Sequence, residues 1–234
     1  MKTLAFLSFL FFGFVMALPG NFNVTTPQQV EAMDKVAAYN QAGGFTTAAE
    51  NNTENGLFGP CKPVTMIYAR GTGESGNVGG KNSPGPAWFA EMRKVMGEDN
   101  LTVQGVNYEA NLFGYLKGGD PEGSQNYYDM ADQAVTKCPD TKLVLGGYSQ
   151  GAQLAHNAAR RYTNEMTSKV VAAVMFGDPY AKHTLGYIPT RKVMTICHEG
   201  DIICKNVGTA SAHLTYAKDA PEAALFVMDM LKQN

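Results

Sequence analysis

The chain has 234 residues, of which 44% are hydrophobic and 17% charged, and its formal net charge is -2 at pH 7. This length is sufficient for one sizeable domain with a buried core. The balanced charge leaves no basic stripe to neutralise phosphates, which argues against a nucleic-acid partner.

The N-terminus has the pattern of a secretory signal peptide. Lys2 precedes an apolar run from Leu4 to Phe12. Val15 and Ala17 occupy the small-residue positions expected before a cleavage site. The run is too short to span a membrane. We therefore expect residues 1–17 to be a signal peptide, and the product to be secreted, extracellular and without stable membrane insertion.

Residues 18–57 carry a weaker pattern. A modest helical periodicity runs from Pro27 to Tyr39, and a stretch rich in Gly, Thr, Asn and Glu follows it. We expect a pro-segment or a flexible N-terminal arm in this region. One ordered domain is expected over residues 58–234.

Strand patterns alternate with helical patterns throughout that domain. Strands are expected at 64–69, 101–108, 170–176 and 191–197, and a fifth begins at Leu143. Helices are expected at 86–96, from a cap at Ser124 to Cys138, after residue 150, and from a capping box at Asp219. The alternation predicts an α/β fold, with a mostly parallel sheet of about five strands covered by helices on both faces.

The first strand leads into the loop Arg70-Gly-Thr-Gly-Glu-Ser-Gly76, whose glycines match the G-x-G-x-x-G pattern of dinucleotide sites. Such a fingerprint opens a helix at once, whereas glycines and prolines between residues 79 and 86 prolong this loop. We interpret it instead as a turn whose backbone N–H groups near Thr72 face the serine site described next. A purely structural glycine turn is the alternative.

The strand from Leu143 enters the motif Gly147-Tyr-Ser-Gln-Gly151, and an alanine-rich helix leaves it. The two glycines allow a tight turn that lifts Ser149 clear of the sheet edge. A serine in this position is a candidate nucleophile. Because the bare G-x-S-x-G pattern also arises by chance, the interpretation depends on the flanking strand and helix.

A nucleophilic serine needs a base, and that base needs an acid to orient it. His156 is excluded because it lies about 10 Å along the helix from Ser149, by helix rise. His183 precedes the late strand ends, and His198 is better placed to support than to react. His213 is the predicted base because it follows the fifth strand and precedes the last helix.

Asp201 is the predicted partner of His213. It lies just past the fifth strand, and the chain order serine, acid, histidine is that of hydrolases with this motif. Asp178, which ends the fourth strand, is the rival acid. Asp219 is interpreted as a helix cap.

The chain has four cysteines, and an even number in an exported protein favours two disulfides. Three pairings are open. The short separation of Cys197 and Cys204 favours their pairing, which leaves Cys61 with Cys138. A zinc site at the short pair is disfavoured because the C-x-x-C spacing is missing.

Four segments together resemble the fungal cutinases and their relatives, the acetylxylan esterases: Tyr68-Ala-Arg-Gly-Thr72, Gly146-Gly-Tyr-Ser-Gln-Gly151, the Cys197 to Cys204 segment with Gly200-Asp201, and Ala212-His-Leu214. The resemblance extends from about residue 58 to the end of the chain. It implies a compact, lidless α/β-hydrolase with a five-stranded parallel sheet. It also implies Ser149 as nucleophile, His213 as base and Asp201 as the acid, and the two disulfide pairs above.

The resemblance further implies an oxyanion hole formed by the N–H groups of Thr72 and Gln150. Residues near these motifs are candidate substrate contacts: Leu112, Phe113, Tyr148, Val207, Thr209 and Leu214.

The expected protein is a monomeric secreted serine esterase, a cutinase that hydrolyses carboxylic esters of cutin and related aliphatic polyesters without a metal or organic cofactor. An acetylxylan esterase or short-chain esterase is the enzyme alternative. A secreted binding protein on a hydrolase scaffold is the non-enzyme alternative.

Overall fold

The structure is a computed structural model, and it describes residues 26–41 and 52–233. The predicted signal peptide, residues 1–17, lies outside the described residues.

Five parallel strands form the central sheet, in the order β2-β1-β3-β4-β5. Their bounds are β1 (Val64–Ala69), β2 (Leu101–Gly105), β3 (Lys142–Tyr148), β4 (Val170–Phe176) and β5 (Val193–Ile196). Strands β1, β2 and β4 are buried along their whole length, as expected of a sheet that is covered on both faces. The predicted α/β fold with a five-stranded parallel sheet is confirmed.

Two strands are shorter than predicted. Strand β2 ends at Gly105, where the Asn77 side chain packs so closely that a Cβ on residue 105 would lie 2.2 Å from Asn77 Oδ1. Strand β5 begins only at Val193, because residues Thr190–Lys192 form the 3₁₀ turn η3. The other 3₁₀ turns are η1 (Gly56–Phe58), η2 (Glu98–Asn100) and η4 (Tyr216–Asp219).

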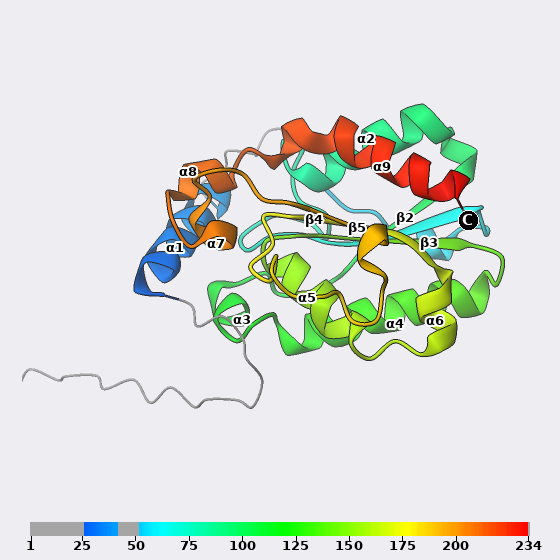
Figure 1. The fold of residues 1–234 in the computed structure, drawn as a ribbon, viewed down its shortest axis with the longest axis horizontal. Helices are drawn as coiled ribbons and strands as arrows, with labels where there is room; N and C mark the ends of the chain where they lie inside the picture. The colour runs from blue at the N-terminus through cyan, green and yellow to red at the C-terminus, as the bar shows by residue number, and fades with distance from the viewer. Residues whose placement is uncertain (1–25, 42–51, 234) are drawn as a thin grey trace, which may run out of the picture.

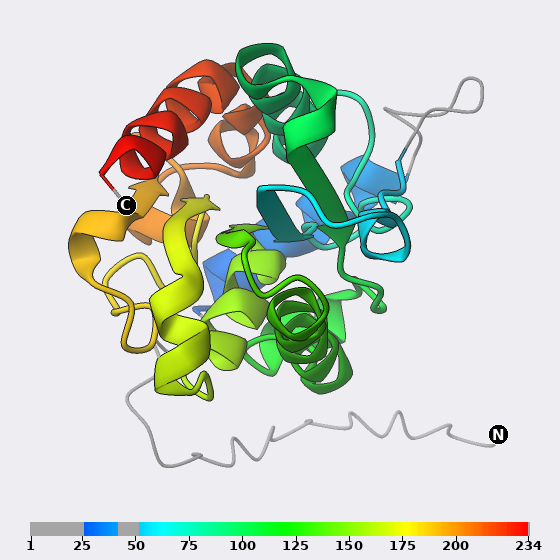
Figure 2. The same cartoon turned by 90° about the vertical axis from the view of Figure 1, so that its right-hand side faces the viewer.

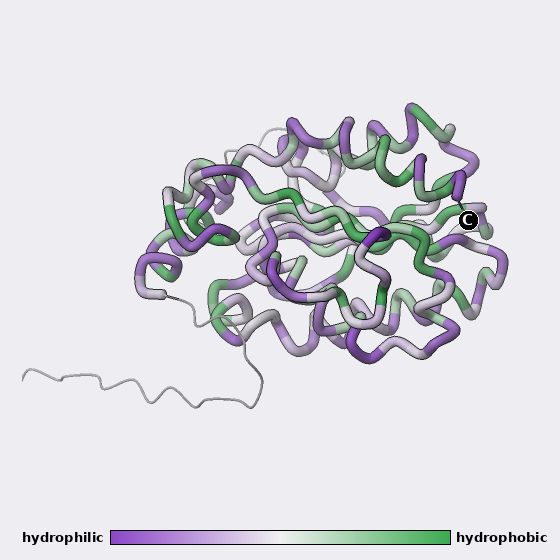
Figure 3. Tube along the Cα trace, in the orientation of Figure 1, coloured by the Kyte–Doolittle hydropathy of each residue, from purple (hydrophilic) through white to green (hydrophobic). Residues whose placement is uncertain are grey.

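Long helices cover both faces of the sheet (Figures 1 and 2). Helices α2 (Pro84–Met96) and α9 (Ala220–Lys232) pack side by side on one face. Helices α4 (Pro121–Lys137), α5 (Gln150–Ala159) and α6 (Asn164–Lys169) lie on the other. Figure 3 shows apolar residues along the central strands and polar residues on the outer turns of the helices. The hydrophobic periodicity of the chain therefore produces a three-layer α/β/α arrangement.

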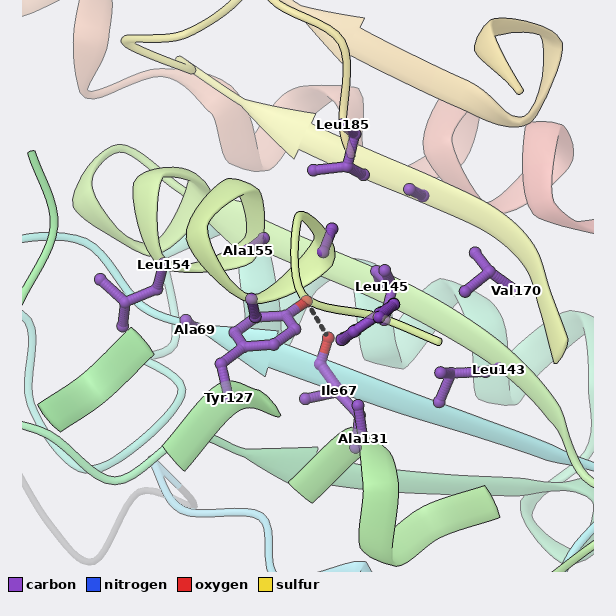
Figure 4. Packing of buried hydrophobic residues seen from close by; sticks show 14 of the residues in the cluster. Ile67, Ala69, Tyr127, Ala131, Leu143, Leu145, Leu154, Ala155, Val170 and Leu185 are labelled. Atoms are coloured by element: carbon purple, nitrogen blue, oxygen red, sulfur yellow. Dashed lines mark hydrogen bonds between the residues drawn. The ribbon is translucent and has the colours of Figure 1, made fainter. Parts of the chain in front are cut away.

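Each face of the sheet has its own hydrophobic core. On the α4–α5 side, Tyr127 is fully buried, and its hydroxyl lies 3.1 Å from the backbone oxygen of Ile67 in β1 (Figure 4). The same hydroxyl accepts the backbone N–H of Gly146 in β3 at 3.1 Å. One tyrosine of α4 thus contributes both apolar burial and a polar link to two central strands.

Two helix caps differ from the prediction. Helix α4 begins at Pro121, and Asp120 is its cap, with Oδ1 accepting the Gly123 N–H at 2.6 Å. Ser124 was the wrong choice, because a proline favours the first helical position and places the cap one residue before it. Asp219 precedes α9 but makes no cap hydrogen bond, so its interpretation as a side-chain helix cap is also wrong.

Four further helices gather at the end of the sheet that lies opposite the C-terminus (Figure 1). They are α1 (Pro27–Gln41), α3 (Leu112–Leu116), α7 (Ile202–Lys205) and α8 (Ala210–His213). The helical pattern predicted from Pro27 is confirmed as α1, which packs against α3, α7 and α8. A flexible arm does not describe residues 26–41. The pro-segment interpretation stays a prediction.

Both predicted disulfides are present. Cys61–Cys138 joins the segment before β1 to the end of α4. Cys197–Cys204 closes the segment between β5 and α7, and Asp201 lies inside that closed loop. Because the short pair forms a disulfide, the zinc alternative at these two cysteines is excluded.

Candidate active site

Ser149 lies at the sharp turn between β3 and α5. Its backbone φ of 55° and ψ of -120° lie in a region that residues other than glycine rarely adopt. The Ser149 N–H donates to the carbonyl oxygen of Phe176 in β4 at 3.0 Å, which helps to hold the turn. A Cβ at Gly151 would lie 2.0 Å from the Ala69 carbonyl, so glycine allows α5 to start against the end of β1.

His213 and Asp201 meet beside this turn. His213 Nδ1 lies 2.7 Å from Asp201 Oδ2, and both side chains are fully buried. Asp201 Oδ1 accepts the N–H of Ile203 at 2.8 Å. Burial by itself would raise the pKa of Asp201, but hydrogen bonds from His213, Tyr216 and Ile203 and the charge of His213 hold that pKa below its ordinary value. The carboxylate is therefore ionised and oriented toward the imidazole.

Tyr148 holds His213 through a hydrogen bond and a ring contact. Its hydroxyl donates to the His213 carbonyl at 2.7 Å, and the two rings stack with centroids 5.0 Å apart. Since Tyr148 immediately precedes Ser149, this stacking brings His213 next to the serine turn. Tyr148 is buried rather than presented on the surface as a substrate contact.

The rival acid Asp178 has a different partner. Its Oδ2 lies 2.9 Å from His156 Nε2, and both side chains are buried. Its Oδ1 accepts the Tyr180 N–H at 2.8 Å. The structure thus pairs Asp178 with the histidine on α5 and does not bring it to His213.

No hydrogen bond joins Ser149 Oγ to His213 Nε2 among the residues that the structure describes. The Ser149 hydroxyl instead lies 3.9 Å from the sulfur of Met33, on helix α1. His213 Nε2 is buried and has no hydrogen-bond partner in the described part of the chain. Catalytic hydrogen bonds commonly tighten only when substrate is bound, so this geometry is compatible with a resting serine–histidine pair.

The predicted oxyanion residues are neighbours. Gln150 is the first residue of α5, so its backbone N–H has no acceptor within the helix. Its side-chain Nε2 donates to Thr72 Oγ1 at 2.8 Å and to the Asn111 carbonyl at 2.9 Å. These bonds tie the loop after β1 and the start of α3 to the serine turn, and so support a preorganised anion site.

Glu74 is a buried carboxyl in the same loop that the motifs did not single out. Its Oε2 accepts the Gly71 N–H at 2.7 Å. Burial raises the pKa of Glu74 to about 7, although hydrogen bonds from Ser83 and Gly71 and the charge of Arg70 act in the opposite direction. The sequence signal was an acid placed among glycines directly after a strand. Its position fixes the backbone that carries Thr72.

Helix α1 covers the site. Met33 packs in a buried cluster with Tyr115, Ile202 and Ile203, and both Ser149 and His213 are 0% exposed. The resemblance implies a lidless fold, whereas here α1 lies over Ser149 and His213. The reason is the apolar face of α1, which covers the apolar ends of α3 and α7 and excludes water from both.

Two polar contacts hold the ends of α1. Near its start, Gln29 Nε2 lies 3.3 Å from the carbonyls of Ile202 and Ile203, and it donates to Asn206 Oδ1 at 2.6 Å. Near its end, Asn40 Nδ2 donates to the carbonyl of Thr72 at 2.9 Å. The helix is thus attached to α7 at one end and to the loop of Thr72 at the other.

The other candidate substrate contacts lie around this covered site. Phe113 is 64% exposed, Val207 is 63% exposed, and Thr209 is also exposed. Leu112 and Leu214 are half-buried, and Leu112 packs against the cluster that contains Met33. That these residues contact substrate stays a prediction.

The sequence model of the cutinase family matches residues 60–231. The chain belongs to the cutinase family. A curated cutinase from Blumeria hordei is 55% identical over 208 residues, which cover 88% of this chain and 88% of that protein. Trichoderma reesei cutinase, solved in complex with a C11Y4 phosphonate inhibitor, is 37% identical with a TM-score of 0.71, covering 86% of this chain and 88% of that one.

The cutinase fold extends to a more distant relative. The catalytic core domain of acetyl xylan esterase from Trichoderma reesei is 21% identical, with a TM-score of 0.59 over 73% of this chain and 100% of that one. At that identity the likeness concerns the fold alone. Family membership confirms the prediction of an enzyme, a serine carboxylic ester hydrolase of the cutinase type.

Proposed function

We propose that this cutinase-family protein is an exported serine esterase that hydrolyses the ester bonds of cutin and related aliphatic polyesters. The observation that carries the proposal is the buried His213–Asp201 pair, 2.7 Å apart, beside a serine held at positive φ. The curated relatives that are named cutinases support the substrate class.

The mechanism follows from the two nitrogens of His213. Asp201 holds Nδ1, so Nε2 is left to accept the proton of Ser149 as its oxygen attacks the ester carbonyl. The N–H groups of Thr72 and Gln150 stabilise the negative oxygen of the tetrahedral intermediate. His213 then donates the proton to the leaving alcohol, and water hydrolyses the acyl group from Ser149 by the same steps.

Substrate access requires α1 to move, because Ser149 and His213 have no exposed surface. Opening would expose Met33 on the helix and Ile202 and Ile203 beneath it. Exposing each such side chain to water costs about 1.5–3 kcal/mol. Contact with an aliphatic polyester surface offsets that cost, so we propose that such a surface favours the open form.

Export is part of the proposal. The segment 1–17 has the pattern of a signal peptide, and the domain contains two disulfides, which persist in oxidising compartments. No helix among residues 26–41 and 52–233 is long and apolar enough to cross a membrane. N-terminal sequencing of protein collected from culture medium tests the cleavage site.

The experiment for the activity compares p-nitrophenyl esters of two, four and longer acyl carbons with a polyester film. Purified, oxidised protein should cleave the film and esters of intermediate length. It should also be labelled at Ser149 by a phosphonate probe, whereas Ser149→Ala should be neither active nor labelled. Activity confined to acetyl esters would favour an acetylxylan esterase. Folded protein that resists labelling even in the presence of the polyester film would favour a binding protein.

A further inference from the structure

Tyr216 lies directly behind the Asp201–His213 pair. Its hydroxyl is 2.5 Å from Asp201 Oδ2, the same oxygen that faces His213 Nδ1. The hydroxyl also accepts the backbone N–H of His198 at 3.0 Å. An N–H can only donate and an ionised carboxylate can only accept, so the single phenolic hydrogen is directed at Asp201. Tyr216 is 1% exposed, so this bond lies in the buried interior.

The outer face of the Tyr216 ring is covered by His198. The two rings stack with centroids 4.1 Å apart and an interplanar angle of 18°. His198 Nε2 lies 2.7 Å from Asp219 Oδ2, and Nδ1 lies 2.9 Å from Thr215 Oγ1. The Asp219 carboxylate, which makes no cap hydrogen bond to helix α9, binds His198 instead.

Two contacts fix the orientation of the His198 ring. Thr215 Oγ1 lies 2.9 Å from His198 Nδ1 and also 2.9 Å from the Ala212 carbonyl oxygen. The Asp219 carboxylate accepts from Nε2 on the other side of the ring. With both nitrogens engaged, the imidazole is held parallel to the phenol ring and covers its face, so the Tyr216 hydroxyl stays directed at Asp201.

The pair also joins two segments of chain that carry the site. His198 lies in the loop closed by the Cys197–Cys204 disulfide, three residues before Asp201. Asp219 lies at the end of η4, the turn that begins with Tyr216. The contact between His198 and Asp219 therefore fixes η4 against the loop of Asp201, and the stacked ring cannot rotate away without breaking it.

We propose that Tyr216 is a positioning residue for Asp201, and that the stacked His198, which Asp219 holds in place, keeps the Tyr216 hydroxyl directed at Asp201. This inference rests on the proposed roles of Ser149, Asp201 and His213. The hydroxyl keeps Asp201 Oδ2 aimed at His213 and takes up part of its negative charge. Without the hydroxyl, the full charge of Asp201 acts on His213 and stabilises its protonated form.

The first test is Tyr216→Phe, assayed with p-nitrophenyl butyrate across pH. The titratable groups that face His213 are Asp201, Tyr148 and Tyr216, and the variant changes one of them. We expect kcat to fall about tenfold with KM nearly unchanged, since the lost bond is to a charged group. The acid limb of the kcat/KM profile should move about half a unit to higher pH, because His213 binds its proton more tightly.

The second test is Asp219→Asn, alone and combined with Tyr216→Phe. Alone, it weakens the bond that holds His198 against the Tyr216 ring, and it should shift the acid limb in the same direction by about half as much. Combined with Tyr216→Phe, it should add no further shift, because no hydroxyl remains to be held in place. Independent, additive shifts would overturn the link between the His198–Asp219 pair and Tyr216.

Tyr162→Phe is the matched control, since Tyr162 is also buried and its hydroxyl has no partner among the described residues. It should leave kcat and the acid limb unchanged. Thermal melting checks that every variant is folded. A folded Tyr216→Phe with wild-type kcat and acid limb would overturn the inference, while an inactive Ser149→Ala would show that the proposed function still holds. An active Ser149→Ala would instead overturn the proposed function.

Discussion

Two buried histidine–aspartate pairs lie in this domain, and they differ in which imidazole nitrogen contacts the carboxylate. Asp201 takes Nδ1 of His213 at 2.7 Å and leaves Nε2, at the tip of the ring, without a partner in the described chain. Asp178 takes Nε2 of His156 at 2.9 Å and leaves Nδ1, which lies next to its own backbone.

The neighbours of the two pairs differ as well. His213 stacks on the tyrosine that precedes Ser149, whereas the ring of His156 meets Tyr180 edge-on at 5.5 Å. The Nε2 tip of His213 is therefore available for proton transfer, whereas Nε2 of His156 is occupied by a carboxylate. The nitrogen that a buried His–Asp pair leaves open thus decides whether the pair can transfer a proton.

The largest expected effect is the loss of activity when Ser149 or Asp201 is replaced. Ser149→Ala should lower kcat about 10⁵-fold, and Asp201→Asn about 10⁴-fold, because the asparagine no longer holds the required tautomer of His213. Steady-state kinetics on p-nitrophenyl butyrate measures both. If Asp201→Asn keeps near-full activity while Asp178→Asn abolishes it, the acid has been assigned to the wrong pair.

The corresponding substitution in the His156–Asp178 pair should affect stability rather than activity. Asp178→Asn weakens a buried hydrogen bond to His156, which should lower the free energy of unfolding by about 2 kcal/mol. The kcat of the folded protein should stay within about threefold of wild type. Urea unfolding and kinetics on the same preparation separate the two effects. Equal losses of activity in Asp178→Asn and Asp201→Asn would erase the distinction between the pairs.

A third buried acid, Glu74, should make the stability of the domain depend on pH. Its pKa is raised from 4.5 to about 7, so the unfolded chain releases this proton at lower pH than the folded protein does. Stability should therefore fall as pH rises from about 4.5 to about 7, by an amount on the order of 3 kcal/mol. Glu74→Gln should flatten this part of the profile in thermal melts.

Asp201 should show the opposite sign, because its pKa is lowered from 3.8. Its contribution to stability is complete above that value and is lost as pH falls through the lower folded pKa. Stability that rises between pH 5 and 7 in wild type and is unchanged in Glu74→Gln would contradict the prediction for Glu74.

The smallest expected effect concerns access to the His213 pair. Gln29→Leu removes the bonds from α1 to Ile202, Ile203 and Asn206. It should weaken the closed form by about 1 kcal/mol and raise kcat/KM on a soluble ester about fivefold. Activity on a polyester film should change little, because the surface already favours opening. Replacement of its exposed neighbour, Gln28→Leu, is the control. Equal effects of both variants would show that the Gln29 hydrogen bonds do not hold α1 closed.

Much of the fold was predictable because its signals are local. The strands β1 and β4 appear at the predicted residues, since continuous apolar runs of that length suit a sheet buried on both faces. The tight turn at Ser149 was predictable from two glycines between a strand and a helix. The pairing of Cys197 with Cys204 followed from their short separation along the chain.

The wrong helix-cap predictions concern residues whose side chains can form more than one kind of hydrogen bond. Ser124 and Asp219 both matched helix-cap patterns, yet Asp120 caps α4, and Asp219 binds His198. An isolated pattern cannot weigh a cap against a partner that lies distant in the chain. The side chain takes the partner that the packed structure places within reach.

By itself, the sequence determined the α/β order of elements, the serine turn and the chain order of Ser149, Asp201 and His213, because each depends on neighbouring residues or on succession along the chain. Tertiary structure alone decided the partner of Asp178, the stack on Tyr216 and the docking of α1 over Ser149. Met33 lies 116 residues from Ser149 along the chain. A helical pattern shows that one face is apolar, but the surface which that face covers is decided only when the whole domain packs.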